Sequence, residues 1–263
     1  MRYFRLIFVF IHAAFNNEAA FRMNFFLNIL SVVLSLLGGM GGIYIIYANN
    51  ESIRGWTMPE TLAVLGVFML VQAISGLFIN PSLNTLGGMG GELETGTFDY
   101  TMLRPISKQY YISLREWSLW QFLHIGVSIG VIAVAASMMD ITLNGISLLL
   151  FLFSILVSTG ILYSILLFVN SVAFWYRGTY LSWIVADILQ TGRYPIGIYP
   201  NRLRFFLTWL FPIGFIVSVP AEAITGKLQP TLLPAGFVLM IVMFVLSSAF
   251  FRISIRKYSG ASS

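Results

Sequence analysis

Six long apolar segments, separated by polar stretches, constrain this chain more than any other feature. A helix that crosses a lipid bilayer needs about 20 mostly apolar residues. Such segments lie at about 23–47, 59–79, 117–139, 146–174, 205–223 and 232–251. Only 10% of the residues are charged, against about 25% in soluble domains, so a water-exposed surface cannot be built from them. The sequence therefore predicts an all-α, polytopic membrane protein with about six transmembrane helices in a single domain, 1–263.

The basic residues support this count, because they cluster in alternate gaps between the apolar segments. With six spans, one side of the membrane receives every Lys and Arg except Arg54 and Lys227. A count of five or seven spans would scatter them. Since an excess of Lys and Arg marks the cytoplasmic side, we expect both termini to be cytoplasmic. The long loops at about 80–116 and 175–204 are then cytoplasmic, and the short loops near 49–58 and 140–145 are external.

The first 22 residues begin like a secretory signal, with Arg2 and Arg5 before a short apolar run. That run, residues 6–11, is too short for a signal and is interrupted by His12. We expect an amphipathic helix that lies at the cytoplasmic interface, an elbow before the first span. A cleaved signal is the weaker alternative.

The chain carries few groups that could support chemistry. It has no cysteine, and its two histidines, His12 and His124, cannot build a multi-histidine metal site. The nucleotide-binding pattern GxxxxGK[ST] does not occur. We therefore expect no enzyme activity, no bound cofactor or metal and no nucleic-acid partner. His124 lies in the third predicted span, where it either contacts a proton or substrate or bonds a neighbouring helix.

The densest charges lie in the first long loop, where acidic residues alternate with apolar ones. From 93 to 103 the apolar positions have roughly helical spacing, which predicts a short amphipathic helix that Pro105 ends. This segment is either a solvated loop or a docking element for a cytoplasmic partner. In the second case we expect the partner's groove to receive Phe98, Met102 and Leu103, while the charges set the register.

The second long loop and the fifth predicted span are irregular. An apolar face over residues 181–189 predicts a helix buried at the cytoplasmic interface. In the fifth span, Pro212 and Pro220 free backbone carbonyls at membrane depth, which predicts a broken or re-entrant outer segment at about 219–230. Glu222 is then either an outer-surface residue or part of an exit gate.

Two blocks of the sequence resemble the ABC-2 type permeases, in a subfamily formerly listed as a domain of unknown function. Residues 91–107, GELETGTFDYTMLRPIS, resemble its G-x-hydrophobic-D…LLRP signature. Residues 193–226 resemble its second block, in which a Tyr-Pro loop leads into a span with prolines near its end. One departure is Phe98, where the family more often has leucine or isoleucine. With the span number and the N-terminal helix, the resemblance covers nearly the whole chain.

The resemblance implies an ABC-2, type V-like exporter permease of the bacterial inner membrane. Such permeases are driven by two copies of a separate ATP-binding subunit that holds ATP and Mg²⁺, and they pair with a second permease chain, identical or paralogous. The resemblance places the ATPase-coupling helix at Glu92, Leu93, Glu94, Thr95, Gly96, Thr97, Phe98, Asp99, Arg104 and Pro105. The family exports drugs, antibiotics, lipids, polysaccharides or peptides, so we expect an amphiphilic or hydrophobic substrate. Candidates for its gate or path are His124, Pro212, Pro220 and Glu222.

The alternative is a secondary, ion-coupled transporter. Such transporters carry carboxylates or arginines within the membrane. The interiors of the six predicted spans hold essentially none of these residues, and His124 is the one ionisable candidate there. An intramembrane enzyme or a channel would need a catalytic cluster or a filter motif, and neither is evident.

Overall fold

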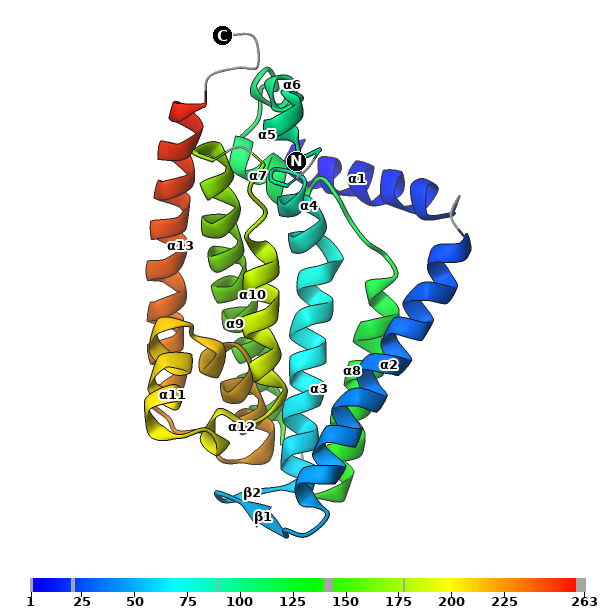
Figure 1. Cartoon of the computed structure of the whole chain (residues 1–263), viewed down its shortest axis with the longest axis vertical. Helices are drawn as coiled ribbons and strands as arrows, with labels where there is room; N and C mark the ends of the chain where they lie inside the picture. The colour runs from blue at the N-terminus through cyan, green and yellow to red at the C-terminus, as the bar shows by residue number, and fades with distance from the viewer. Residues whose placement is uncertain (1, 20–21, 89, 140–143, 177, 259–263) are drawn as a thin grey trace.

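The computed structural model describes residues 2–19, 22–88, 90–139, 144–176 and 178–258. Within these residues, five long helices form a bundle (Figure 1): α2 (Arg22–Tyr47), α3 (Met58–Ile74), α8 (Gln121–Met138), α9 (Gly145–Ser171) and α13 (Leu232–Lys257). A π-turn (Ser75–Ile79) and α4 (Asn80–Asn84) extend α3, and a 3-10 turn (Val172–Phe174) extends α9. All five are long and apolar enough to cross a membrane. The prediction of an all-helical membrane protein is confirmed.

Helix α3 lies at the centre of the bundle. Every residue from Thr61 to Val71 is buried, because neighbouring helices cover this helix on all sides. The outer helices each leave one apolar face uncovered: on α9, Leu148, Leu152 and Leu156 recur at helical spacing and are each at least half exposed. Faces of this kind suit contact with lipid tails.

The two ends of the bundle differ in structure. At one end, strands β1 (Ser52–Ile53) and β2 (Trp56–Thr57) form an antiparallel hairpin between α2 and α3. We call this the hairpin end. Lys227 fastens the loop before α13 to it, donating hydrogen bonds to the Gly55 carbonyl (2.5 Å) and to the Glu60 carboxylate (2.6 Å).

The opposite end, which we call the α5–α6 end, carries α1 (Arg2–Ala19) and the short helices α5 (Glu92–Thr95), α6 (Phe98–Met102) and α7 (Lys108–Leu114). Helix α1 lies across the bundle rather than along it (Figure 1). Its Glu18 carboxylate accepts hydrogen bonds from the Leu119 N–H at 2.9 and 3.1 Å, which ties α1 to the chain just before α8. Burial raises the pKa of this carboxyl, and its hydrogen bonds oppose that shift.

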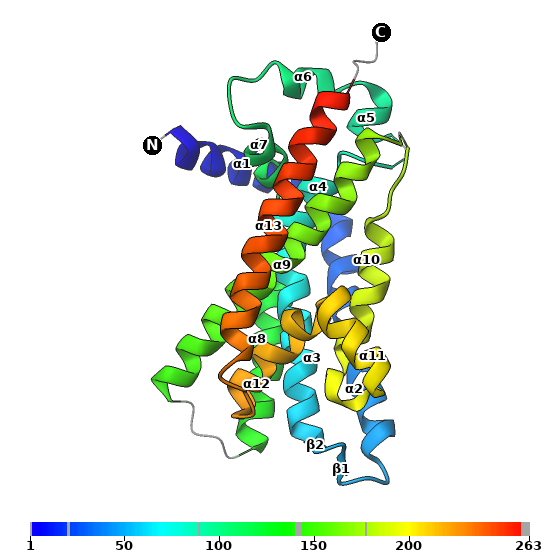
Figure 2. The same cartoon turned by 90° about the vertical axis from the view of Figure 1, so that its left-hand side faces the viewer.

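The fifth crossing of the bundle differs from the prediction. The Gly88 N–H donates to the Thr179 carbonyl (3.0 Å) at the α5–α6 end. At the hairpin end, Arg54 Nη1 donates to the Tyr199 carbonyl (2.7 Å). Residues 181–198 therefore cross between the two ends, through α10 (Ser182–Leu189) and two 3-10 turns (Gln190–Arg193 and Ile196–Ile198) (Figure 2). The predicted loop at 175–204, placed on one side of the membrane, is wrong.

The segment predicted as the fifth span is instead re-entrant. It comprises α11 (Asn201–Phe205) with a π-turn (Phe206–Leu210), then a second π-turn (Gly214–Ser218) with α12 (Val219–Thr225), and the two halves meet at 81°. The break falls at Pro212, after an extended Phe211. Both ends of the pair lie at the hairpin end, through Tyr199 and Lys227. The re-entrant segment is therefore 201–225, with its break at Pro212, rather than the predicted 219–230.

With this correction some basic residues change ends, but the excess of Lys and Arg stays at the same end of the bundle. Arg202 and Arg204, predicted to lie with the long loops, belong to α11 and join Arg54 and Lys227 at the hairpin end. Arg193 lies between the ends. Arg177 and residues 140–143 of the second short loop lie outside the described residues. The α5–α6 end still holds more of the basic residues, including Arg104, Lys108, Arg115, Arg252, Arg256 and Lys257.

Candidate functional site

The predicted coupling segment forms two short helices at the α5–α6 end, not one. Gly96 adopts φ +75° between α5 and α6, a left-handed conformation that favours glycine and ends the first helix. The second helix ends at Met102, before Pro105. The two helices cap the end of the bundle (Figure 2). The prediction of a continuous helix from 93 to 103 is therefore wrong, because glycine at this position reverses the chain direction.

Phe98 anchors α6 to the bundle. Its side chain is fully buried, and its ring packs edge-on against Phe174 after α9 (5.1 Å between centroids) and Tyr258 after α13 (5.2 Å). Leu93 of α5 is buried as well. The prediction that Phe98 enters a partner's groove is therefore wrong, because the protein's own core already surrounds this ring.

Glu92 anchors α5. Its carboxylate pairs with Arg115 Nη1 at 2.6 Å, and the Arg115 side chain is 5% exposed. The Arg115 guanidinium also donates to Thr85 Oγ1, just after α4. Glu92 thus connects α5 to the spans through α4 and α7, and we infer a structural role for it rather than a contact with a partner.

We expect Glu92→Ala to lower the free energy of unfolding by about 1–3 kcal/mol, because Arg115 would remain buried without its carboxylate. Thermal unfolding of the purified chain would measure the loss. Glu94→Ala is the matched control: Glu94 lies on the same helix but is exposed, and its carboxylate accepts one hydrogen bond, from the Gly90 N–H. Equal losses in the two variants would contradict the anchoring role.

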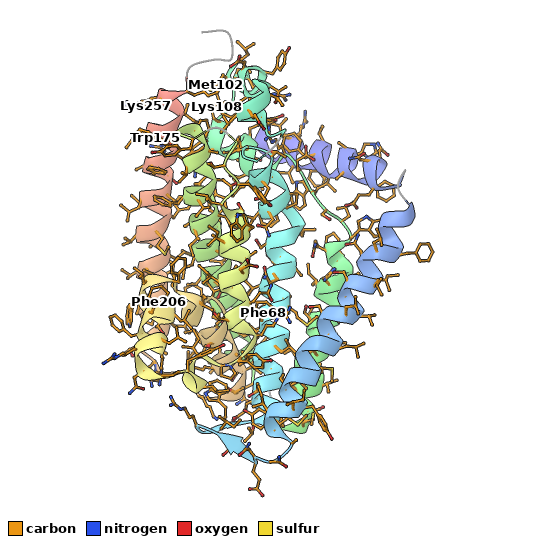
Figure 3. All side chains as sticks on the ribbon, in the orientation of Figure 1. Phe68, Met102, Lys108, Trp175, Phe206 and Lys257 are labelled. Carbon is orange, nitrogen blue, oxygen red and sulfur yellow. The ribbon has the colours of Figure 1, made fainter. Side chains whose placement is uncertain are left out.

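Other residues of the same segment form an exposed face at the α5–α6 end. Tyr100 is 71% exposed, Leu103 81% and Met102 38%. Arg104 stacks on the Tyr111 ring at 4.4 Å, and Lys108 donates to the Met102 and Arg104 carbonyls at 2.7 and 2.6 Å. Figure 3 shows Met102 and Lys108 at the α5–α6 end, near Trp175 and Lys257. Glu94, Thr95, Thr97 and Pro105 are also exposed, and Asp99 is half-buried.

A cavity of about 550 Å³ opens at the hairpin end, between β2, the re-entrant pair and the start of α13. Its charged lining residues are Arg54, Arg204 and Glu222. The predicted gate residue Glu222 thus faces a cavity. Pro212 and Pro220 shape the backbone around it: Pro212 lies at the break, and Pro220 is the second residue of α12, where its missing N–H costs no intrahelical hydrogen bond of that helix.

A second, polar cavity of about 230 Å³ lies between α2, α3, α8 and the turn after α10. His124 lines it, apart from Pro212, Pro220 and Glu222, so the structure does not bring the four predicted gate residues together. Among the described residues, the His124 ring has no hydrogen-bond partner, which removes the predicted bond to a neighbouring helix. The sequence analysis missed this cavity's other polar residues: Ser31, Ser35, Gln72, Asn80, Gln121, Gln190 and Arg193.

The lining of these cavities offers groups that suit the recognition of a ligand. In the part of the chain that the structure describes, no three His, Cys, Asp or Glu side chains are grouped closely enough to hold a metal ion. The cavities instead offer guanidinium, amide and hydroxyl groups beside aromatic rings. These groups suit the binding of a ligand or its movement along the bundle.

Comparison with known proteins identifies one family. A family model described as "ABC-2 family transporter protein" matches residues 14–262, nearly the whole chain. No curated protein and no solved structure matches the chain.

Proposed function

The chain belongs to the ABC-2 family of transporter proteins, and on that premise we propose that it is the membrane-spanning subunit of an ATP-driven exporter. In this proposal a separate subunit, present in two copies, binds ATP and Mg²⁺ and hydrolyses the nucleotide. This chain performs no chemistry and moves an amphiphilic or hydrophobic substrate across the bacterial inner membrane. The α5–α6 end is the cytoplasmic one, because it carries the excess of Lys and Arg.

The observation that carries the proposal is the mechanical connection beneath the exposed α5–α6 face. Tyr100, Met102 and Leu103 are available to a partner, while Phe98 joins α6 to the ends of α9 and α13. Glu92, through Arg115, joins α5 to the end of α4. A subunit that pulled on this face would therefore displace three membrane spans together.

The resulting motion would be a rigid-body rocking of the bundle. Packed helices have discrete arrangements rather than continuous deformations, so a displacement at one end is passed on to the other. The substrate must bind one arrangement better than the other for ATP hydrolysis to drive its movement. The 550 Å³ cavity at the hairpin end, bordered by Glu222, is the proposed exit.

Asp187 supports the proposal of a second permease chain. It is exposed on α10, about 8 Å along the helix axis from Ser182, in a segment that crosses the bundle. A carboxylate that faces lipid within a membrane-crossing segment is costly. A second copy or a paralogue packed against α10 would cover it.

Ion-coupled secondary transport remains the second candidate, and one finding favours it. Arg193 lies between the two ends, in the same cavity as His124, so the interior of the bundle holds an ionisable group besides His124. Such residues are typical of ion-coupled transporters. Transport that continues in ATP-depleted vesicles with an ion gradient would support this candidate against an ATP-driven one.

The test of the proposed function is a double variant of the exposed face. We expect Tyr100→Ala with Leu103→Ala to weaken copurification of the ATP-binding subunit at least about tenfold, because Tyr is a frequent binding hot spot and Leu103 adds apolar area beside it. The matched control is Tyr44→Ala with Leu37→Ala, at 67% and 61% exposure on α2. Unchanged copurification and ATPase activity in the first variant would contradict docking at this face.

A further inference from the structure

The polar cavity between α2, α3, α8 and the turn after α10 contains an unbalanced charge. In its described lining, Arg193 is the one permanently charged residue, and no carboxylate is present. The other polar groups that face it are neutral amides and hydroxyls and the His124 imidazole, from every surrounding element: Ser31, Ser35, Gln72, Asn80, Gln121 and Gln190. The cavity is therefore electropositive.

Arg193 lies near the middle of the membrane. Its guanidinium carbon is 5.7 Å from the centroid of the Phe68 ring on α3. Phe68 lies about 15 Å along the helix axis from Met58, at about 1.5 Å per residue, and a bilayer core is about 30 Å thick. Figure 3 shows Phe68 well inside the bundle, between the two ends.

No acidic side chain among the described residues neutralises this arginine. Among the described residues Arg193 forms no ion pair, and its Nε is buried without a hydrogen-bond partner. Arginines at membrane depth are normally paired with an acid or with backbone carbonyls. An unpaired donor that faces a polar cavity therefore points to an anion supplied from outside the chain.

The dimensions of the cavity limit what that anion can be. Pockets for whole small molecules usually measure about 300–1,000 Å³, whereas this one holds about 230 Å³. It suits a compact head group such as a phosphate or a carboxylate. The cavity is bordered by Ser31, which is exposed on α2 between the exposed apolar residues Leu30 and Leu34. An apolar chain attached to the head group can lie along these leucines.

We propose that this cavity binds the anionic head group, phosphate or carboxylate, of an amphiphilic substrate. Arg193 pairs with the anion, which planar guanidinium groups bind through two hydrogen bonds. Gln72, Gln121 and Gln190 supply neutral donors. The inference rests on the proposed function and names the class of substrate that the exporter carries.

The test is a binding measurement without ATP, on the full chain with any subunits that copurify, in nanodiscs of phosphatidylcholine. The probe is radiolabelled dodecyl phosphate. We expect Arg193→Gln to weaken binding by about tenfold or more. Arg193→Lys keeps the charge but not the planar pair of donors, so its binding should lie between that of Arg193→Gln and that of the unmodified chain. Arg256→Gln, at an exposed arginine near the end of α13, serves as the control and should bind as the unmodified chain does.

Four results would overturn the proposal. Equal binding by Arg193→Gln would remove the arginine from the site. Competition by inorganic phosphate as strong as that by unlabelled dodecyl phosphate would indicate a site for free anions, and competition by dodecyltrimethylammonium would indicate a site without charge preference. Loss of the second permease chain from Arg193→Gln would instead assign Arg193 to a subunit contact.

The same preparations separate this inference from the proposed function. If dodecyl phosphate does not bind but the copurified subunit still hydrolyses ATP, the substrate class is wrong and the ATP-driven function stands. If dodecyl phosphate binds but no ATP-hydrolysing subunit is found, the substrate class stands and the energy source is wrong.

Discussion

Replacing Phe98 by alanine is expected to lower the free energy of unfolding by about 3–5 kcal/mol, the usual cost of removing a fully buried phenylalanine. The ring is 0% exposed and contacts Phe174 and Tyr258, so its removal leaves a cavity where α6 meets the ends of α9 and α13. Thermal or denaturant unfolding of the purified chain measures this loss. We also expect partner-stimulated ATPase activity to fall, because the exposed face would no longer be held to the bundle.

Leu103→Ala is the control for this prediction. Leu103 is 81% exposed, five residues further along the same segment, so its truncation should change stability by about 0.5 kcal/mol or less. The two variants separate anchoring from docking: Phe98→Ala should lower stability, whereas Leu103→Ala should weaken only the proposed contact with the partner. An unaltered stability in Phe98→Ala would show that α6 is not fastened to the spans as described.

A cysteine placed at Asn201 is expected to react from the same side of the membrane as a cysteine at Glu51, and from the opposite side to one at Thr97. All three positions are exposed: Asn201 begins α11, Glu51 precedes the hairpin, and Thr97 lies between α5 and α6. The chain has no cysteine of its own, so each variant carries a single reporter. A membrane-impermeant maleimide applied to intact cells should give an all-or-none difference.

This labelling experiment distinguishes two topologies directly. A fifth crossing at 205–223, as the hydropathy pattern indicates, would place Asn201 on the same side as Thr97. The crossing at 181–198 places it with Glu51. Joint labelling of Asn201 and Thr97 from one side would therefore overturn the re-entrant arrangement of α11 and α12.

Five of the six predicted spans appear in the structure with boundaries close to those expected. They could be predicted because lipid-facing helices need long, uninterrupted apolar runs, which hydropathy detects directly. The family resemblance was equally visible, since its first block lies in a polar segment between those runs and its second contains the prolines of the fifth run. The prolines indicated an irregular fifth span but did not locate its break at Pro212.

The crossing at 181–198 could not be recognised in the same way. It contains Asp187 and Arg193 and is broken by 3-10 turns, so it reads as a charged interfacial loop. Such a segment crosses the bundle only because protein surrounds much of it: Gly192 lets the backbone pack closely against Phe68, Ile213 and Val217. That closeness is a tertiary contact, which hydropathy does not report.

The coupling segment shows a similar limit. Its position and exposure to solvent were predictable. Which of its apolar residues is buried was not, because Phe98 and Leu103 are both apolar and only the fold distinguishes them. Arg193 was visible in the sequence as a single charge after an apolar helix. Its significance depends on the cavity shared with Gln72 and His124, which come from two other helices.

The central claim is that ATP hydrolysed by a separate subunit, bound at the α5–α6 end, drives this membrane bundle. Isolation of the tagged chain from its native membrane, followed by native mass spectrometry and an ATPase assay, tests it most directly. We predict two permease chains with two copies of a nucleotide-hydrolysing subunit, which is lost from the Tyr100→Ala/Leu103→Ala variant. A purified assembly without any nucleotide-hydrolysing subunit that still moves its cargo would contradict the claim.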